Sequence, residues 1–152
     1  MFIKVKKTHV DAVIPTYGTD GAGAFDIYSI GQGRIQPGET YTVRTGLSFE
    51  IPHGFALMVY SRSGHGFKCN VKLVNGTGII DSDYRGELLI KLERFKHNDD
   101  DKMYMHTETF EIKKGDRIAQ GIILPVPRVS FIETEELSET ARGTGGFGST
   151  GA

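Results

Sequence analysis

The sequence lacks the features that define several large classes of protein. It has no tryptophan and one cysteine, Cys69, which excludes an intramolecular disulfide and a cysteine-rich zinc site. Its 18 Lys and Arg residues balance 19 Asp and Glu residues, so no basic field attracts nucleic acid or a membrane surface. No apolar run approaches about 18 residues, and the N-terminus MFIKVKKTHV lacks a signal-peptide core. We therefore expect a cytoplasmic protein with neither nucleic-acid nor membrane partners.

Glycine, in contrast, is abundant, with 20 residues in a chain of 152, against an average of about 7%. Turn signals separate short alternating or β-branched runs, and no segment keeps helical periodicity for more than about three turns. This pattern predicts an all-β sandwich or jelly roll with at most one or two short helices. We expect one domain over residues 1–137 and a small, polar, flexible C-terminal arm over residues 138–152. The expected strands lie in Phe2–Lys7, Tyr41–Ile51, Phe55–Ser61, Val71–Val74, Glu87–Phe95, Thr107–Ile112 and Arg117–Val126.

Five stretches are polar or glycine-rich where a strand pattern would predict apolar residues. They are GAFDI (Gly23–Ile27), SRSGHG (Ser61–Gly66), NGTGIIDSDYRGE (Asn75–Glu87), GDRIAQG (Gly115–Gly121) and RGTGGFGSTG (Arg142–Gly151).

The third stretch is the most informative. Its Asn-Gly pair at Asn75 favours a tight hairpin turn, so we expect the flanking strands to pair and to bring Asn75 and Asp81 to one end. Such a hairpin can read the edge of a planar base. Asp81 follows two isoleucines, where burial could tune a carboxylate as a general base. Tyr84 offers a flat ring to a sugar. The alternative is an acidic hairpin loop with a half-buried tyrosine.

The other stretches supply groups that suit a phosphorylated ligand. Arg62 and its neighbouring serines would form an anion site if a helix begins there, or a capped turn with a surface salt bridge. Asp26 lies among apolar residues and needs a partner, which could be an arginine, a backbone cap or a water network around a metal. Arg142 can grip phosphate oxygens and Phe147 can stack on a base. Because glycine loses the most conformational entropy on ordering, this tail would become ordered only if contacts with a bound ligand offset that loss.

Taken in order, the five stretches resemble the five motifs of the trimeric deoxyuridine triphosphatases (dUTPases), from about Gly23 to Gly151. The third and fifth motifs are the most specific. The resemblance implies a dUTPase-like β-clip jelly roll, a homotrimer with shared active sites and Mg²⁺ bound with the triphosphate. It also implies hydrolysis of dUTP to dUMP and pyrophosphate, which limits uracil incorporation into DNA and supplies dUMP for thymidylate synthesis.

The resemblance also implies a role for each site residue. Asp81 would activate the attacking water, and Tyr84 would lie under the deoxyribose. Asp26 would reach Mg²⁺ only through water, because the triphosphate would hold most of the metal. The arm would close over the active site of a neighbouring subunit. Substrate binding would further use Arg62, Ser63, Gly64, Asn75, Gly78, Ile80, Gln120, Arg142, Phe147, Gly148, Ser149 and Thr150.

Some positions depart from the common family pattern, and other readings stay open. Ser61 and His65 replace the proline and leucine that commonly enclose the second motif. A dCTP deaminase of the same fold would need an acid–base group at C4 of cytosine, and no matching Glu/Arg constellation is present. A non-catalytic nucleotide sensor or protein-binding module is the other alternative, with Lys96–Lys102 (KHNDDDK) as a possible partner-binding loop. That loop is most simply a solvated hairpin tip, and the longer segment Phe95–His106 has no implied role.

Overall fold

The computed structural model describes residues 1–96, 109–147 and 149. In this part of the chain, strands predominate and a single short helix occurs, so the predicted all-β fold class is confirmed. The described residues form no helix with the length and hydrophobicity to cross a membrane. The elements are β1 (Lys4–Lys7), β2 (Thr16–Tyr17), β3 (Phe25–Tyr28), β4 (Gly33–Ile35), β5 (Thr40–Arg44), β6 (Leu47–Glu50), β7 (Phe55–Tyr60), α1 (Ser63–Cys69), β8 (Val71–Leu73), β9 (Thr77–Ile80), β10 (Leu89–Arg94), β11 (Phe110–Ile112) and β12 (Arg117–Pro125).

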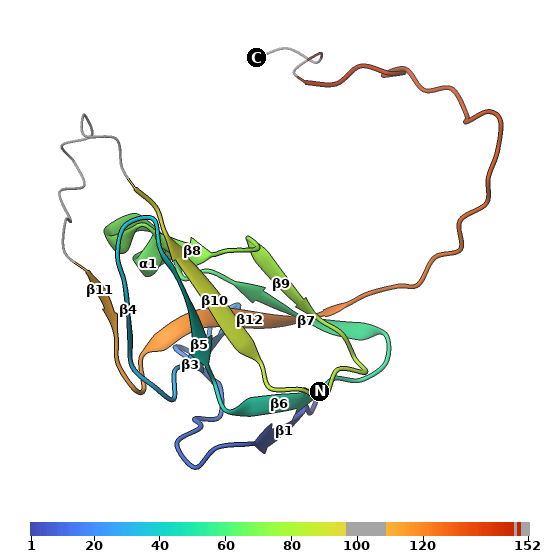
Figure 1. The fold of residues 1–152 in the computed structure, drawn as a ribbon. Coiled ribbons are helices and arrows are strands. Elements are labelled where there is room, and N and C mark those ends of the chain that lie inside the picture. The colour runs from blue at the N-terminus through green and yellow to red at the C-terminus, as the bar shows by residue number, and fades with distance from the viewer. Residues whose placement is uncertain (97–108, 148, 150–152) are drawn as a thin grey trace.

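Two sheets enclose one hydrophobic core (Figure 1). The larger sheet has the order β2-β3-β12-β7-β9, and the smaller has the order β5-β10-β8. Two antiparallel pairs, β1-β6 and β11-β4, complete the described fold. The core receives alternate side chains from both sheets, as the two-residue period of a strand requires; examples are Ile27 and Leu57 from the larger sheet and Ile90 and Leu92 from the smaller.

The predicted strand Tyr41–Ile51 is in fact two strands, because the chain changes direction at Thr45 and Gly46. The Thr45 hydroxyl donates a hydrogen bond to the Leu88 carbonyl oxygen at 2.7 Å and so replaces a ladder contact. Gly46 has φ +66°, and a Cβ there would lie 2.9 Å from the His9 Cβ. Only glycine fits this corner without strain.

The expected pairing of the strands on either side of Asn75 is wrong. A turn does form, with φ +67° at Gly76 and a 3.1 Å hydrogen bond from its amide to the Leu73 carbonyl oxygen. However, β8 pairs with β10, whereas β9 pairs with β7. The turn therefore carries the chain from one sheet to the other. Asn75 and Asp81 consequently lie at opposite ends of β9, separated by about 13 Å of extended chain.

Regular structure ends at Pro125 in the described chain, and the residues beyond it form a C-terminal extension (126–147 and 149). This extension runs away from the body of the molecule (Figure 1). Its apolar side chains are strongly exposed, including Phe131 at 94% and Ile132 at 87%. The last strand thus ends before residue 138, although the Val126 amide still donates a 2.8 Å hydrogen bond to the Gly54 carbonyl oxygen. The boundary of the flexible arm at residue 138 stays a prediction.

Candidate active site

Asp26 is the centre of a polar cluster where three strands lie side by side. It pairs in register with Gln120 of β12, and Gln120 pairs in turn with Tyr60 of β7. One Asp26 carboxylate oxygen lies 3.4 Å from Arg62 Nε, and the other lies 3.2 Å from Arg117 Nη1. The Asp26 side chain is only 13% exposed. Its partners are therefore arginines, one of the alternatives that the sequence left open.

The start of α1 lies beside this carboxylate. Arg62 is the N-cap residue in an extended conformation, and the first helical turn contains no acidic side chain. Ser63 and Gly64 are exposed there. The Gln120 side-chain amide donates a 3.1 Å hydrogen bond to the Ser61 carbonyl oxygen and so fastens β12 to the start of the helix. Five predicted site residues thus lie together: Asp26, Arg62, Ser63, Gly64 and Gln120. We call this group the anion cluster, because its guanidinium, hydroxyl and amide donors suit a bound anion.

Sequence reasoning gave no role to two further side chains of this cluster, Arg117 and His65. Arg117 was visible in the fourth stretch, but its pairing with Asp26 spans 91 positions of the sequence. The His65 ring approaches Arg62, with 3.4 Å between Nε2 and Nη1. His65 was visible in the second stretch, but nothing in the sequence placed it against Arg62.

A cavity of about 300 Å³ lies between β9 and the segment 88–91, and Asn75, Gly78 and Ile80 line it. This volume is at the lower end of the range for small-molecule sites, about 300–1,000 Å³. Apolar side chains form much of the wall, Val59 among them. A Cβ on Gly78 would lie 3.3 Å from the Val59 Cβ, so a larger residue would crowd the cavity.

Asp81 lines a second cavity of about 320 Å³ near the turn that contains His53. Its side chain is exposed. The burial considered for Asp81 is therefore not supplied by its own chain. The reason is topological, because β9 is an edge strand of the larger sheet and Asp81 follows its last residue.

Tyr84 is fixed within the loop that follows Asp81. Its amide donates a 3.2 Å hydrogen bond to the Asp81 carbonyl oxygen, and its hydroxyl donates a 3.1 Å hydrogen bond to the Glu87 carbonyl oxygen. A methyl group on Gly86 would overlap the ring. Tyr84 remains 45% exposed and can present its flat ring to a ligand.

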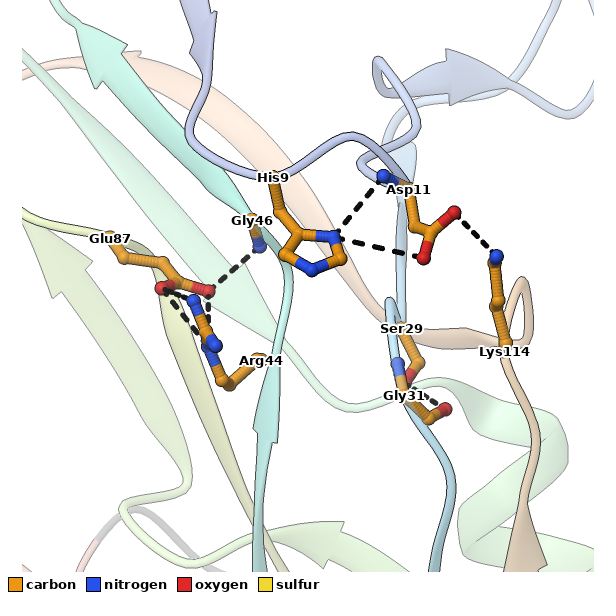
Figure 2. A network of polar contacts seen from close by, with 8 residues as sticks. All are labelled: His9, Asp11, Ser29, Gly31, Arg44, Gly46, Glu87 and Lys114. Carbon is orange, nitrogen blue, oxygen red and sulfur yellow. Dashed lines mark hydrogen bonds and ion pairs between the residues drawn. The ribbon is translucent and has the colours of Figure 1, made fainter.

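Glu87 anchors the end of this loop to the corner between β5 and β6 (Figure 2). Its carboxylate accepts hydrogen bonds of 2.8 Å from Arg44 Nη2 and from the Gly46 amide. The hydrogen bond from Arg44 is the largest cause that lowers the pKa of Glu87. Asp11 joins Lys114 and His9 on the other side of Gly46. Sequence reasoning missed this anchor because Arg44 and Glu87 are 43 positions apart.

The described residues of the fifth motif, Arg142, Phe147 and Ser149, lie in the C-terminal extension, which runs away from the body of the molecule (Figure 1). Arg142 Nε donates a 2.8 Å hydrogen bond to the Gly145 carbonyl oxygen, and the Ser149 amide donates one of 3.1 Å to that of Gly146. Phe147 is fully exposed. Two other predicted residues, Gly148 and Thr150, lie outside the described residues, as does the loop Lys96–Lys102 beyond its first residue.

The dUTPase family model matches residues 10–151 of this chain. The chain belongs to the dUTPase family. A deoxyuridine 5'-triphosphate nucleotidohydrolase of Nautilia profundicola is 47% identical over 99% of both chains. One of Helicobacter pylori strain 26695 is 39% identical over 99% of this chain and 97% of its own. The dUTPase of Staphylococcus bacteriophage 80alpha, solved with dUPNHPP, superimposes with a TM-score of 0.86 at 29% identity, covering 99% of each chain.

The donor groups of this dUTPase fit a metal ion that the substrate helps to hold. Within the described ranges, no three His, Cys, Asp or Glu side chains gather closely enough to hold an ion. Both Asp26 carboxylate oxygens already face guanidinium groups. Mg²⁺ typically takes one or two carboxylates, several waters and substrate phosphates. The residues therefore suit water-mediated contact from Asp26, and they do not form a protein cage.

The anion cluster and Asp81 lie at opposite ends of the same strand pair. In the β7–β9 register, Tyr60 faces Thr77 and Leu57 faces Ile80. Asp81 therefore lies next to Ala56, whereas Arg62 continues from the far end of β7. About 20 Å of strand separates them. A single nucleotide phosphate cannot contact both groups of one chain.

Proposed function

We propose that this dUTPase hydrolyses dUTP to dUMP and pyrophosphate in sites shared between copies of the chain, with Asp81 of one copy acting on phosphates held by Arg62 of another. The observation that carries the proposal is the division of the predicted residues into two intact groups about 20 Å apart. Each group is complete in itself, and neither reaches the other within one chain.

The nucleoside would lie along β9. The cavity lined by Asn75, Gly78 and Ile80 accepts uracil at one end, where strand amides and carbonyls read the edge of the base. The Tyr84 ring packs under the deoxyribose and leaves no space for a 2′-hydroxyl. The sugar then points its 5′ carbon toward Asp81, as the separation of about 13 Å along β9 allows.

The phosphates would be held by the anion cluster of a neighbouring copy. Arg62 and Gln120 contribute side-chain donors, and Ser63 and Gly64 contribute a hydroxyl and backbone amides. Asp26 keeps Arg62 and Arg117 in place through its two carboxylate contacts. When bound, Mg²⁺ neutralises phosphate charge and orients the triphosphate for attack.

The reaction itself is a single displacement at the α-phosphorus. Asp81 accepts a proton from water, the water oxygen bonds to the phosphorus, and the bond to the bridging oxygen breaks. Pyrophosphate leaves and dUMP remains. In phosphoryl transfer of this kind, positioning and electrostatic stabilisation supply most of the rate. The exposure of Asp81 in one chain is removed when a second copy covers it.

The C-terminal arm would complete the site. Arg142, Ser149 and Thr150 hold phosphate oxygens, while Phe147 covers uracil together with the Gly148 backbone. The exposed apolar residues between β12 and the arm support packing of this segment on another copy, because such side chains rarely remain in water over a long stretch. We propose a homotrimer on these grounds and on the family resemblance.

Pyrophosphate release from dUTP, dCTP, dTTP and UTP, with Mg²⁺ or with EDTA, tests this function directly. We expect fast release from dUTP alone and its loss in EDTA. Ammonia release from dCTP is measured in parallel, because it would identify a deaminase. Failure to release pyrophosphate from any nucleotide by folded protein would reject the proposal.

A further inference from the structure

We infer that His65 is a positioning residue for substrate binding: its neutral imidazole accepts a hydrogen bond from Arg62 and holds that guanidinium beside Asp26, so protonation of His65 weakens phosphate binding. This inference rests on the proposed role of Arg62. It concerns a side chain, His65, that the sequence analysis had not placed in the site.

The start of α1 brings the two side chains together. Arg62 is the N-cap residue, and His65 lies three positions later in the first turn. The His65 amide donates to the Arg62 carbonyl oxygen at 3.1 Å, which fixes the first turn. The same Arg62 nitrogen, Nη1, donates to the Arg117 carbonyl oxygen at 3.1 Å and approaches His65 Nε2 at 3.4 Å. His65 is thus one of the groups that define the Arg62 conformation.

The chemistry of the pair determines the His65 tautomer. A guanidinium group can only donate hydrogen bonds, so Nε2 must be the unprotonated acceptor and Nδ1 must carry the proton. Protonation at Nε2 would place two N–H donors against each other. The contact would then become repulsive, and Arg62 would lose one of the partners that orient it.

Two charged groups near His65 oppose its protonation: Arg62, the N-cap residue of α1, and Arg117 of β12. Asp116, in the turn before β12, has the opposite effect, which is smaller than that of Arg62. Phe110 of β11 meets the imidazole edge-on, with ring centroids 5.1 Å apart. Burial, followed by the charge of Arg62, lowers the pKa of His65. The neutral acceptor form is therefore favoured at neutral pH, because the pKa of His65 lies below the ordinary histidine value of 6.5.

Two substitutions separate this role from simple packing. His65→Leu fills the space against Phe110 but removes the acceptor, whereas His65→Gln keeps an uncharged acceptor on a side chain of similar reach. We expect H65L to raise KM for dUTP about three- to tenfold near pH 8, with kcat changed less than about twofold. H65Q should stay close to the wild-type KM at this pH.

The pH profile provides a readout that a packing role would not move. We use the ratio of the wild-type KM to the H65Q KM at each pH. Ionisation of the nucleotide affects both KM values equally, so it does not change this ratio. We expect this ratio to stay near one at neutral pH and to rise as the pH falls below the ordinary histidine pKa of 6.5 and through the lowered pKa of His65. A ratio that stays flat or falls would overturn the inference, as would an unchanged KM in H65L. If H65L melts at a lower temperature than the wild type, the H65Q profile alone decides.

Arg62→Gln distinguishes this inference from the proposed function. A normal KM in R62Q would reject the phosphate site itself. A raised KM in R62Q, together with a wild-type KM in H65L, would reject only the role of His65.

Discussion

Asp26 shows what a nearly buried carboxylate needs in this fold. An unpaired charge at this position would be strongly destabilising, and two guanidinium groups remove that penalty. The sequence was sufficient to predict the need for a partner, because Asp26 stands between Phe25 and Ile27. It could not identify Arg117, which is 91 positions away and becomes a neighbour only when β12 pairs with β3.

Asp81 is the residue on which turnover should depend most. Asp81→Asn keeps the shape of the side chain but removes the proton acceptor. We expect kcat to fall about 10²- to 10⁴-fold, while the affinity for a non-hydrolysable imido analogue of dUTP changes less than about threefold. Stopped-flow turnover and calorimetric binding measure the two quantities. Asp20→Asn, an exposed carboxylate outside the site, serves as the control, and near-normal kcat in D81N would refute the assignment.

Elements were easier to locate in the sequence than to pair. The alternating run at Phe55–Ser61 is β7, and the run at Arg117–Val126 is β12, each within one residue of its predicted end. Strands as short as β2 and β4 leave no detectable period. The turn at Asn75 was predicted correctly, but the Asn-Gly pair determines only that the chain turns there. It does not determine which strands the flanking segments pair with. The partner of β9 depends on which sheet edge is open.

The Asp81–Glu87 loop owes its position to the anchor at Glu87. Because Arg44 lowers the pKa of Glu87 below the ordinary 4.5, this pair stabilises the folded state above that value. The stabilisation disappears as pH falls through the lower, folded-state pKa. We therefore expect Glu87→Gln to lower Tm by about 2–4 °C at pH 7, with the difference vanishing in acid.

Thermal melts of E87Q and wild type from neutral to strongly acidic pH test this expectation. Glu111→Gln is a matched control, because its partner Arg34 lies 3.6 Å away and both side chains are at least half exposed. Exposed pairs of this kind contribute little. A Tm difference for E87Q that is constant at all pH values would show that the carboxylate charge is not what anchors the loop.

At the scale of the whole molecule, the distance between Arg62 and Asp81 decides how the enzyme must work. Local patterns in the sequence revealed both groups, yet they carried no information on the separation. The distance is set by the antiparallel register of β7 with β9, which places Asp81 beside the start of β7 and Arg62 beyond its end. Two residues 19 positions apart in the sequence are therefore separated by the length of a strand. Under the proposed function, assembly of several copies is therefore required for catalysis.

Complementation between two impaired variants tests the shared site. D81N copies, with a reduced kcat, and R62Q copies, with a raised KM, are co-expressed with different tags, isolated as mixed assemblies and assayed at low dUTP concentration. Sites that combine Arg62 of a D81N copy with Asp81 of an R62Q copy are intact, and each mixed trimer contains about one such site in three. We expect activity on dUTP to return to roughly that level. An activity in verified mixed assemblies no higher than that of the separate variants would contradict a site shared in this way.

Gly86 determines where the Tyr84 ring can lie. The Tyr84 ring can rest where it does only because Gly86 carries no methyl group. That ring is the surface proposed to tell deoxyribose from ribose. Discrimination between a DNA precursor and an RNA precursor would then depend on the absence of a Cβ atom at Gly86, two residues after the tyrosine that contacts the sugar.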